Sequence, residues 1–207
     1  MFDAGCGAGY NLKMYESLGT VFGCDFSEDA LYFCQQRGLV RLVKADVNAL
    51  PYKNGKFDLI SMLDVLSHES IPDDVKVLEG IVGLLKDGGH VLLTDNALKI
   101  LRSPHDLAYH VRERYRKKML KRRMEKAGLE VLRMSYFNFF LFPAIFFVRF
   151  AERIRGAKTG PVESDLKAVP RLANSFLFGI LKFEALLMKK INLPWGSSLI
   201  CLARKIP

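Results

Sequence analysis

The stretch DAGCGAG, residues 3–9, decides the fold of this chain, because glycines stand at positions 5, 7 and 9, directly after a short strand predicted at residues 1–4. Glycine takes left-handed backbone conformations without strain and lets a ligand approach the main chain closely. A phosphate-binding loop would end in Gly-Lys-Ser or Gly-Lys-Thr, and a dinucleotide-binding turn would need glycine at position 10, where the sequence has Tyr10. The stretch therefore predicts a strand-to-helix turn that holds a ligand of another kind.

Outward from this turn, short apolar runs alternate with helical patterns as far as residue 98. Ser27 stands where it would cap a helix over residues 28–37, and Gly38 stands just past the end of that helix. Further strands are predicted at residues 20–26, 40–47, 57–63 and 88–97, with a second helix at residues 72–86. Such alternation predicts an α/β fold with a doubly wound, mostly parallel sheet.

The second half of the chain has a different character. Its basic stretch, residues 105–127, is predicted as a helix and is followed by a strand from residue 129. Two apolar segments, residues 143–150 and 172–191, come before a last strand. We predict one domain over residues 1–207, divided into a ligand-binding half (1–98), a basic helix and strand (99–142), an apolar helical insertion or cap (143–195) and the last strand (196–207).

Composition narrows the class of protein. The 31 Lys and Arg residues against 22 Asp and Glu residues give a net charge of +9, which indicates an anionic partner. The four cysteines form no CxxC pair and have no paired histidine spacing, so we expect reduced core thiols, no metal site and a cytoplasmic protein.

The glycine motif resembles the first motif of the class I S-adenosylmethionine-dependent methyltransferases, and the family's other pieces follow in order. The resemblance implies a seven-stranded sheet and S-adenosylmethionine as the cofactor. Asp25 in FGCDFS would take the ribose hydroxyls, Asp46 in KADVNALPY would reach the adenine amino group, and LDVLSH, residues 63–68, would contact the methionine part. The predicted cofactor-binding residues are Asp3, Gly5, Cys6, Gly7, Gly9, Asp25, Phe26, Asp46, Val47, Leu63 and Asp64.

Methyl transfer from a sulfonium is an in-line displacement, so the protein chiefly aligns the acceptor and excludes water. A base is needed only where the acceptor loses a proton of high pKa, and histidine suits that role near neutral pH. The candidates are His68, His105, Asp106 and His110. The alternative is structural: His68 bonds a loop, and His105 with Asp106 opens a helix.

The segment SPHDLAYHVRERY, residues 103–115, resembles a subset of these enzymes. Arg112, Arg114 and Tyr115 would then bind an anionic or polar group of the acceptor, because the guanidinium of arginine offers a two-pronged fork. The alternative is a basic helix face in contact with water.

Basic residues beside Phe-rich segments are typical of elements that lie in a membrane interface. We therefore expect the insertion to cap the acceptor pocket and to contact a lipid-like substrate or an anionic membrane surface, on the inner face of the membrane. The alternative is that both apolar helices pack on each other and on the sheet.

Three functions remain open from the sequence. The first is methyl transfer to a small-molecule or lipid-like acceptor, the second is a non-catalytic cofactor-binding or membrane-associated module, and the third is a nucleic-acid methyltransferase. Only Met1 and Phe2 precede Asp3, whereas the resemblance implies a helix before the first strand. We therefore expect an N-terminally truncated chain.

Overall fold

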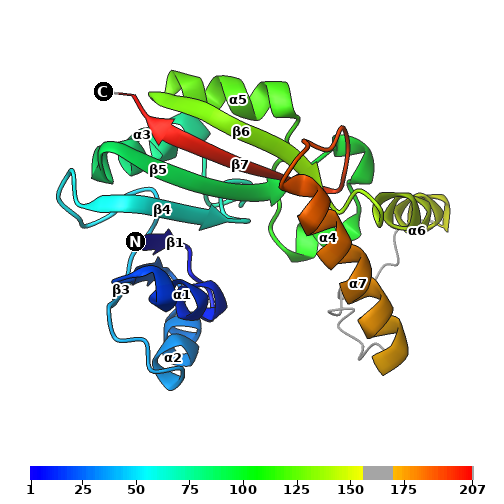
Figure 1. Ribbon diagram of the computed structural model, residues 1–207, viewed down its shortest axis with the longest axis horizontal. Coiled ribbons are helices and arrows are strands. Elements are labelled where there is room, and N and C mark those ends of the chain that lie inside the picture. Colours follow the sequence, from blue (N-terminus) through cyan, green and yellow to red (C-terminus); the bar gives the residue numbers. More distant parts are fainter. Residues whose placement is uncertain (156–169, 207) are drawn as a thin grey trace.

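The computed structural model of the protein describes residues 1–155 and 170–206, without the side chains of residues 104, 105 and 152–155. Its centre is a seven-stranded sheet in the order β3-β2-β1-β4-β5-β7-β6 (Figure 1). Only β7 runs antiparallel to its neighbours β5 and β6, which confirms the mostly parallel sheet. The strands are β1 (Phe2–Ala4), β2 (Phe22–Asp25), β3 (Leu42–Lys44), β4 (Phe57–Leu63), β5 (Leu85–Asn96), β6 (Leu129–Phe137) and β7 (Ser198–Lys205).

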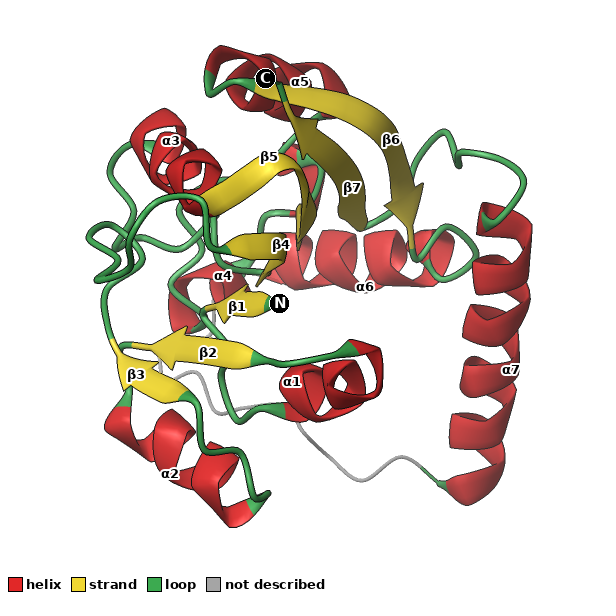
Figure 2. Ribbon diagram, turned by 60° about the vertical axis from the view of Figure 1, so that its left-hand side comes forward, coloured by secondary structure: helices red, strands yellow, loops and turns green. Residues whose placement is uncertain are grey.

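Helices cover the two ends of the sheet. The helices α3 and α5 pack beside each other near β5 and β6, whereas α1 and α2 lie near β2 and β3 (Figures 1 and 2). The helices are α1 (Tyr10–Tyr15), α2 (Glu28–Gln36), α3 (Asp74–Leu84), α4 (Pro104–Ala108), α5 (Lys117–Lys126), α6 (Phe142–Arg155) and α7 (Arg171–Met188), with short 3-10 turns at Glu16–Leu18 and Lys99–Leu101.

Local sequence explains where α2 and α3 begin. The Ser27 hydroxyl accepts a hydrogen bond from the Ala30 N–H at 3.3 Å, which confirms the predicted cap of α2. At α3 the Asp73 carboxylate accepts from two free N–H groups of the first turn. Positions 77, 78, 81 and 84 then form a helical stripe that is buried in the main core.

The basic stretch, residues 105–127, is not one helix, which corrects the prediction. It forms α4 and α5, and the chain between them is irregular. Tyr115 is fully buried there, and its hydroxyl donates to the Asp74 carboxylate at 2.7 Å. Val111 and Tyr115 also form isolated β-bridges, with His68 and Ala97 respectively. A continuous helix could not satisfy these contacts, so burial of Tyr115 overrides the local helical pattern.

The helices α6 and α7 lie at the end of the sheet where β5 and β6 finish, and α7 extends away from it (Figure 1). Of the residues of α7 only Glu184 is buried, and its carboxylate accepts from the N–H groups of Asn138 and Phe140. The C-terminal end of α7 is held by the Arg133 guanidinium, which donates to the carbonyls of Met188, Lys189 and Ile191. Within the described residues, no helix is long and apolar enough to cross a bilayer.

Candidate active site

The glycine turn after β1 is held tightly between two other segments. Gly5 has φ +78°, and a Cβ there would lie 2.5 Å from a methyl group of Val65, just after β4. Gly9 has φ +81°, and a Cβ there would lie 2.6 Å from Leu39. Both contacts are closer than carbon atoms can approach, so only glycine fits these positions. A Cβ on Gly7 would meet nothing within 4 Å, so the turn is open at its middle.

The carboxylate of Asp25, at the end of β2, holds this turn in place. One of its oxygens accepts from the Gly7 N–H at 2.8 Å, and the other accepts from the Ser27 N–H at 2.9 Å. A carboxylate oxygen has two lone pairs, so each oxygen retains acceptor capacity after these bonds. Asp25 thus presents a fixed, preoriented acceptor to the space beside Gly5.

That space is a pocket of about 340 Å³ at the carboxyl ends of the strands. It brings together seven of the residues predicted to bind the cofactor, together with His68. Two carboxylates, from Asp25 and Asp46, share the pocket with the largely exposed Phe26 ring and the side chain of Val47. The lining consists of Gly5, Asp25, Phe26, Ala45, Asp46, Val47, Leu63, Asp64, Val65, His68 and Ser70.

Four residues of the predicted cofactor set, Asp3, Cys6, Gly7 and Gly9, lie outside this lining. Asp3 is fully buried and accepts from the Ser61 hydroxyl at 2.6 Å, and burial raises its pKa to about 6. Cys6 packs in the small apolar cluster under α1 and α2. These four residues build the turn or lie beneath it, and direct contact of each with the cofactor stays a prediction.

Two candidate histidines meet at the edge of the pocket. The Nδ1 atom of His68 accepts from the Ser70 N–H at 3.1 Å, so the neutral ring carries its proton on Nε2 and can donate from there. The Nδ1 atom of His110 lies 2.6 Å from Glu69 Oε1, which leaves Nε2 of His110 to accept a proton. The centroids of the two rings are 5.6 Å apart. Sequence reasoning missed Glu69, although it directly follows His68.

The remaining predicted residues are committed to internal contacts. Asp106 and Arg114 form a buried two-pronged ion pair, with contacts of 2.6 and 2.7 Å. Arg112 is paired with Asp74, which also accepts from the buried Tyr115. Asp106 is thus engaged in an ion pair, and Arg112, Arg114 and Tyr115 are each bonded within the protein, so their predicted roles toward the acceptor stay predictions. The side chain of His105 lies outside the described part of the chain.

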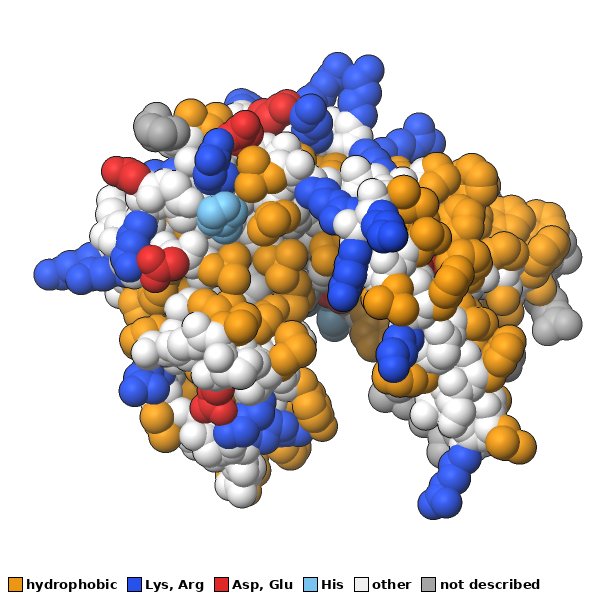
Figure 3. Space-filling model, viewed as in Figure 1, with side chains coloured by type: hydrophobic (Ala, Val, Ile, Leu, Met, Phe, Trp, Pro, Cys, Tyr) orange, Lys and Arg blue, Asp and Glu red, His pale blue; other side chains and the backbone are white. Residues whose placement is uncertain are grey.

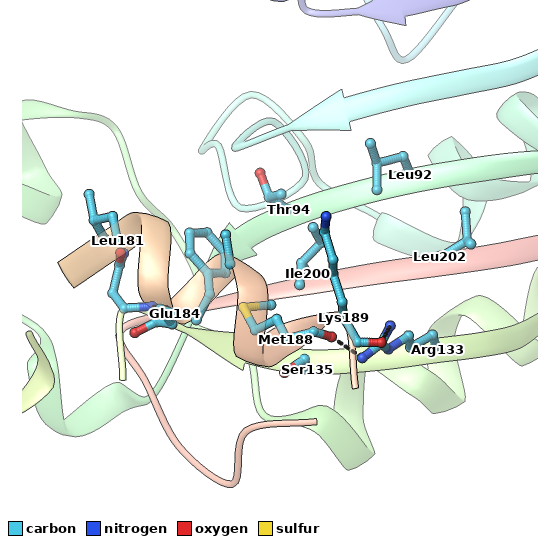
Figure 4. Close-up of a pocket in the computed structure, with 13 residues that line it drawn as sticks. Leu92, Thr94, Arg133, Ser135, Leu181, Glu184, Met188, Lys189, Ile200 and Leu202 are labelled. Atoms are coloured by element: carbon cyan, nitrogen blue, oxygen red, sulfur yellow. Dashed lines mark hydrogen bonds between the residues drawn. The ribbon is translucent and has the colours of Figure 1, made fainter. Parts of the chain in front are cut away.

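A second cavity of about 570 Å³, the α7 groove, lies between α7 and the outer face of β5, β7 and β6 (Figure 4). Its walls are largely apolar, and Thr94 lies at its β5 side (Figure 4). The Thr94 hydroxyl is 3.5 Å from Asp64 Oδ1, and Asp64 lines the first pocket. Burial raises the pKa of Asp64. The groove thus adjoins the pocket. Its lining is Leu92, Thr94, Arg133, Ser135, Phe137, Asn138, Leu181, Glu184, Ala185, Met188, Lys189, Ile200 and Leu202.

Comparison with known proteins agrees with this arrangement. Residues 2–93 match the family described as Methyltransferase domain. Over 101 residues the chain is 30% identical to a ubiquinone biosynthesis O-methyltransferase of Marinobacter nauticus. That alignment covers 44% of this chain and 42% of the relative, so the chain matches less than half the length of that relative.

Solved structures share the fold over the whole described chain. An S-adenosylmethionine-dependent methyltransferase from Mesorhizobium loti has a TM-score of 0.66 at 16% identity, covering 99% of this chain and 89% of that one. A geranyl diphosphate C-methyltransferase from Streptomyces coelicolor, solved with S-adenosyl-L-homocysteine, has a TM-score of 0.64 at 15% identity, covering 99% and 70%. At these identities the likeness establishes the fold.

Proposed function

We propose that the chain is a class I S-adenosylmethionine-dependent methyltransferase, which binds S-adenosylmethionine and transfers its methyl group to a small-molecule or lipid-like acceptor. The match of residues 2–93 to the methyltransferase-domain family supports this proposal. The observation that carries the proposal is the single pocket in which Gly5, Asp25 and Asp46 meet. Bound there, the cofactor supplies an electrophilic methyl group on a sulfonium.

The side chains of the pocket fit an adenosyl group. Asp25 would accept hydrogen bonds from the two ribose hydroxyls with the lone pairs that Gly7 and Ser27 leave free. Asp46 would accept from the adenine amino group, and Phe26 and Val47 would pack against the base. Leu63 and Asp64 would then face the methionine part, next to the mouth of the α7 groove.

The two histidines have different roles toward the acceptor: one is the base and the other is a hydrogen-bond donor. His110 takes the proton of an acceptor hydroxyl on Nε2, because Glu69 fixes its Nδ1 as the donor atom. His68 donates from Nε2 and holds the acceptor oxygen toward the methyl group. These roles suit transfer to oxygen, which is the chemistry named for the ubiquinone biosynthesis relative.

The α7 groove favours an acceptor with an apolar portion. Leu92, Ile200 and Met188 provide hydrocarbon walls, and Thr94 marks the side that adjoins the pocket. An amphiphile seated there places its reactive polar end toward Asp64 and its apolar part along the sheet. This supports a lipid-like acceptor over a fully polar one.

A transfer assay tests the proposal. Purified chain is incubated with S-adenosylmethionine labelled in the methyl group and with separate lipid, aqueous and nucleic-acid fractions of bacterial cells. We expect label in the lipid fraction, and we expect His110→Gln to lower the rate about 100-fold or more. Replacing His90, which is partly exposed on β5 and lines neither cavity, with Gln serves as the control. Label confined to nucleic acid, or no transfer in any fraction by a folded chain, would reject the proposal.

A further inference from the structure

The helix α7 has an apolar face that the described part of the chain leaves largely exposed, although Phe183 meets Phe140 at 5.6 Å between ring centroids. Leu172, Phe176 and Phe183 are 88%, 69% and 58% exposed. They are spaced four and seven residues apart, so they lie on one side of the helix. The α7 groove lies on the opposite side, where Leu181 and Met188 point. A buried helix of similar composition would hide such side chains, so among the described residues this face is open to solvent.

Positive side chains flank this apolar face. Arg171, Lys182 and Lys189 are spaced eleven and seven residues apart, which places them along one edge of it. The acid in α7, Glu184, is buried and bonded to the N–H groups of Asn138 and Phe140, so it does not offset these charges at the surface. The exposed surface of α7 is thus both apolar and cationic.

The neighbouring helix extends the same surface. In α6, Phe147, Val148 and Phe150 are all more than half exposed. Trp195, in the loop after α7, is half exposed and stacks on Phe139 at 5.2 Å between ring centroids. Figure 3 shows hydrophobic side chains gathered over α6 and α7, with Lys and Arg side chains around them.

We propose that the α6–α7 surface docks the protein on an anionic lipid bilayer, with α7 lying in the interface. Aromatic and aliphatic side chains enter the boundary between headgroups and acyl chains, and flanking lysines and arginines pair with acidic headgroups. A second copy of the chain fits less well, because a symmetric contact would set the cations of one copy against those of the other. Docking brings the α7 groove close to the lipid that supplies an apolar acceptor.

Vesicle flotation tests the proposal without depending on catalysis. We expect the chain to float with vesicles of phosphatidylcholine containing about 30 mol% phosphatidylglycerol, to float less with phosphatidylcholine alone, and to be released by salt. The double variant Leu172→Ser with Phe176→Ser should bind at least about tenfold more weakly. Arg171→Glu with Lys182→Glu should remove the preference for the anionic vesicles. The matched control is Phe33→Ser, since Phe33 is half exposed on α2.

Two results would overturn the proposal. One is failure of the folded chain to float with the anionic vesicles. The other is a dimer, seen by light scattering, that Leu172→Ser with Phe176→Ser dissociates while vesicle binding is unchanged. A methyl-transfer defect of the chain leaves flotation unaffected, so failure of the proposed activity and failure of docking are distinguished.

Discussion

The helices α3 and α7 are both rich in apolar residues, yet the protein uses them in opposite ways. Positions 77, 78, 81 and 84 of α3 are buried in the main core, and so is its Asp74. The longer helix α7 buries only Glu184. Hydrophobic packing therefore holds α3, whereas polar clamps at Glu184 and Arg133 hold α7.

The contrast between α3 and α7 shows how much an apolar helical pattern in the sequence reveals about the surroundings of the helix. The pattern indicates that a helix face avoids water, but it does not indicate whether protein or lipid covers that face. The buried face of α3 packs against β5 and α5. The apolar face of α7 remains open, which is what a docking element needs.

The sharpest test of this contrast is one truncation in each helix. Ile81→Ala in α3 should lower the free energy of unfolding by about 2–5 kcal/mol, because it leaves a cavity in the core. Phe176→Ala in α7 should change it by less than about 0.5 kcal/mol in the absence of lipid, because the ring is exposed. Urea denaturation followed by circular dichroism measures both, and equal losses would show that α7 is a core helix.

A second test concerns the buried acid Asp95 in β5, next to the pocket strands. Burial raises its pKa to about 7, although the Ser67 and Asn96 N–H groups partly offset this. In the unfolded chain the pKa of an aspartate is about 3.9. From about pH 4 to pH 7 the folded protein therefore keeps a proton on Asp95 that the unfolded chain has lost. The free energy of unfolding consequently falls as the pH rises through this range.

Asp95→Asn removes this titration. The stability of the variant relative to the natural chain should therefore increase from about pH 4.5 to pH 8, by up to about 4 kcal/mol. Urea denaturation across this pH range measures the difference in free energy of unfolding between the variant and the natural chain. Asp87→Asn, at an exposed position, is the control. A difference that does not depend on pH would show that Asp95 is ionised throughout.

The smallest expected effect concerns the clamp on α7. Glu184→Ala leaves the N–H groups of Asn138 and Phe140 without their acceptor, at a cost of about 1–3 kcal/mol. Because the clamp is local, we expect faster hydrogen exchange in α7 with little change in α3. Glu79→Ala, on the polar side of α3, is the matched control. Unchanged exchange in α7 would mean that other contacts hold this helix.

The first half of the fold could be predicted because its signals are local. The glycine turn, the Ser27 cap and the alternating strands are each encoded within a few residues. The stretch 105–127 was mispredicted because Tyr115 is buried against Asp74, about forty residues earlier in the chain. A hydrogen bond between residues so far apart in the chain leaves no signal in the local sequence pattern.

In the candidate active site, too, local signals could be predicted from the sequence and long-range contacts could not. The carboxyl ends of neighbouring parallel strands meet at one edge, so Asp25, Asp46 and Asp64 could be placed together from sequence. The pairing of Arg112 could not, because Asp74 lies in α3, 38 residues earlier in the chain. Asp106 is only eight residues from Arg114, but their pairing depends on the irregular chain between α4 and α5. The pairing of Glu69 with His110 likewise joins two loops that are distant in the chain.

The central claim is that the pocket beside Gly5 holds an adenosyl cofactor, and calorimetric titration of the purified chain with S-adenosylhomocysteine tests it most directly. We expect saturable binding with one site per chain. Asp25→Ala should weaken that binding by at least about tenfold, and Asp29→Ala, on the exposed side of α2, should not. Absence of binding by the folded chain, or equal binding by Asp25→Ala, would contradict the claim.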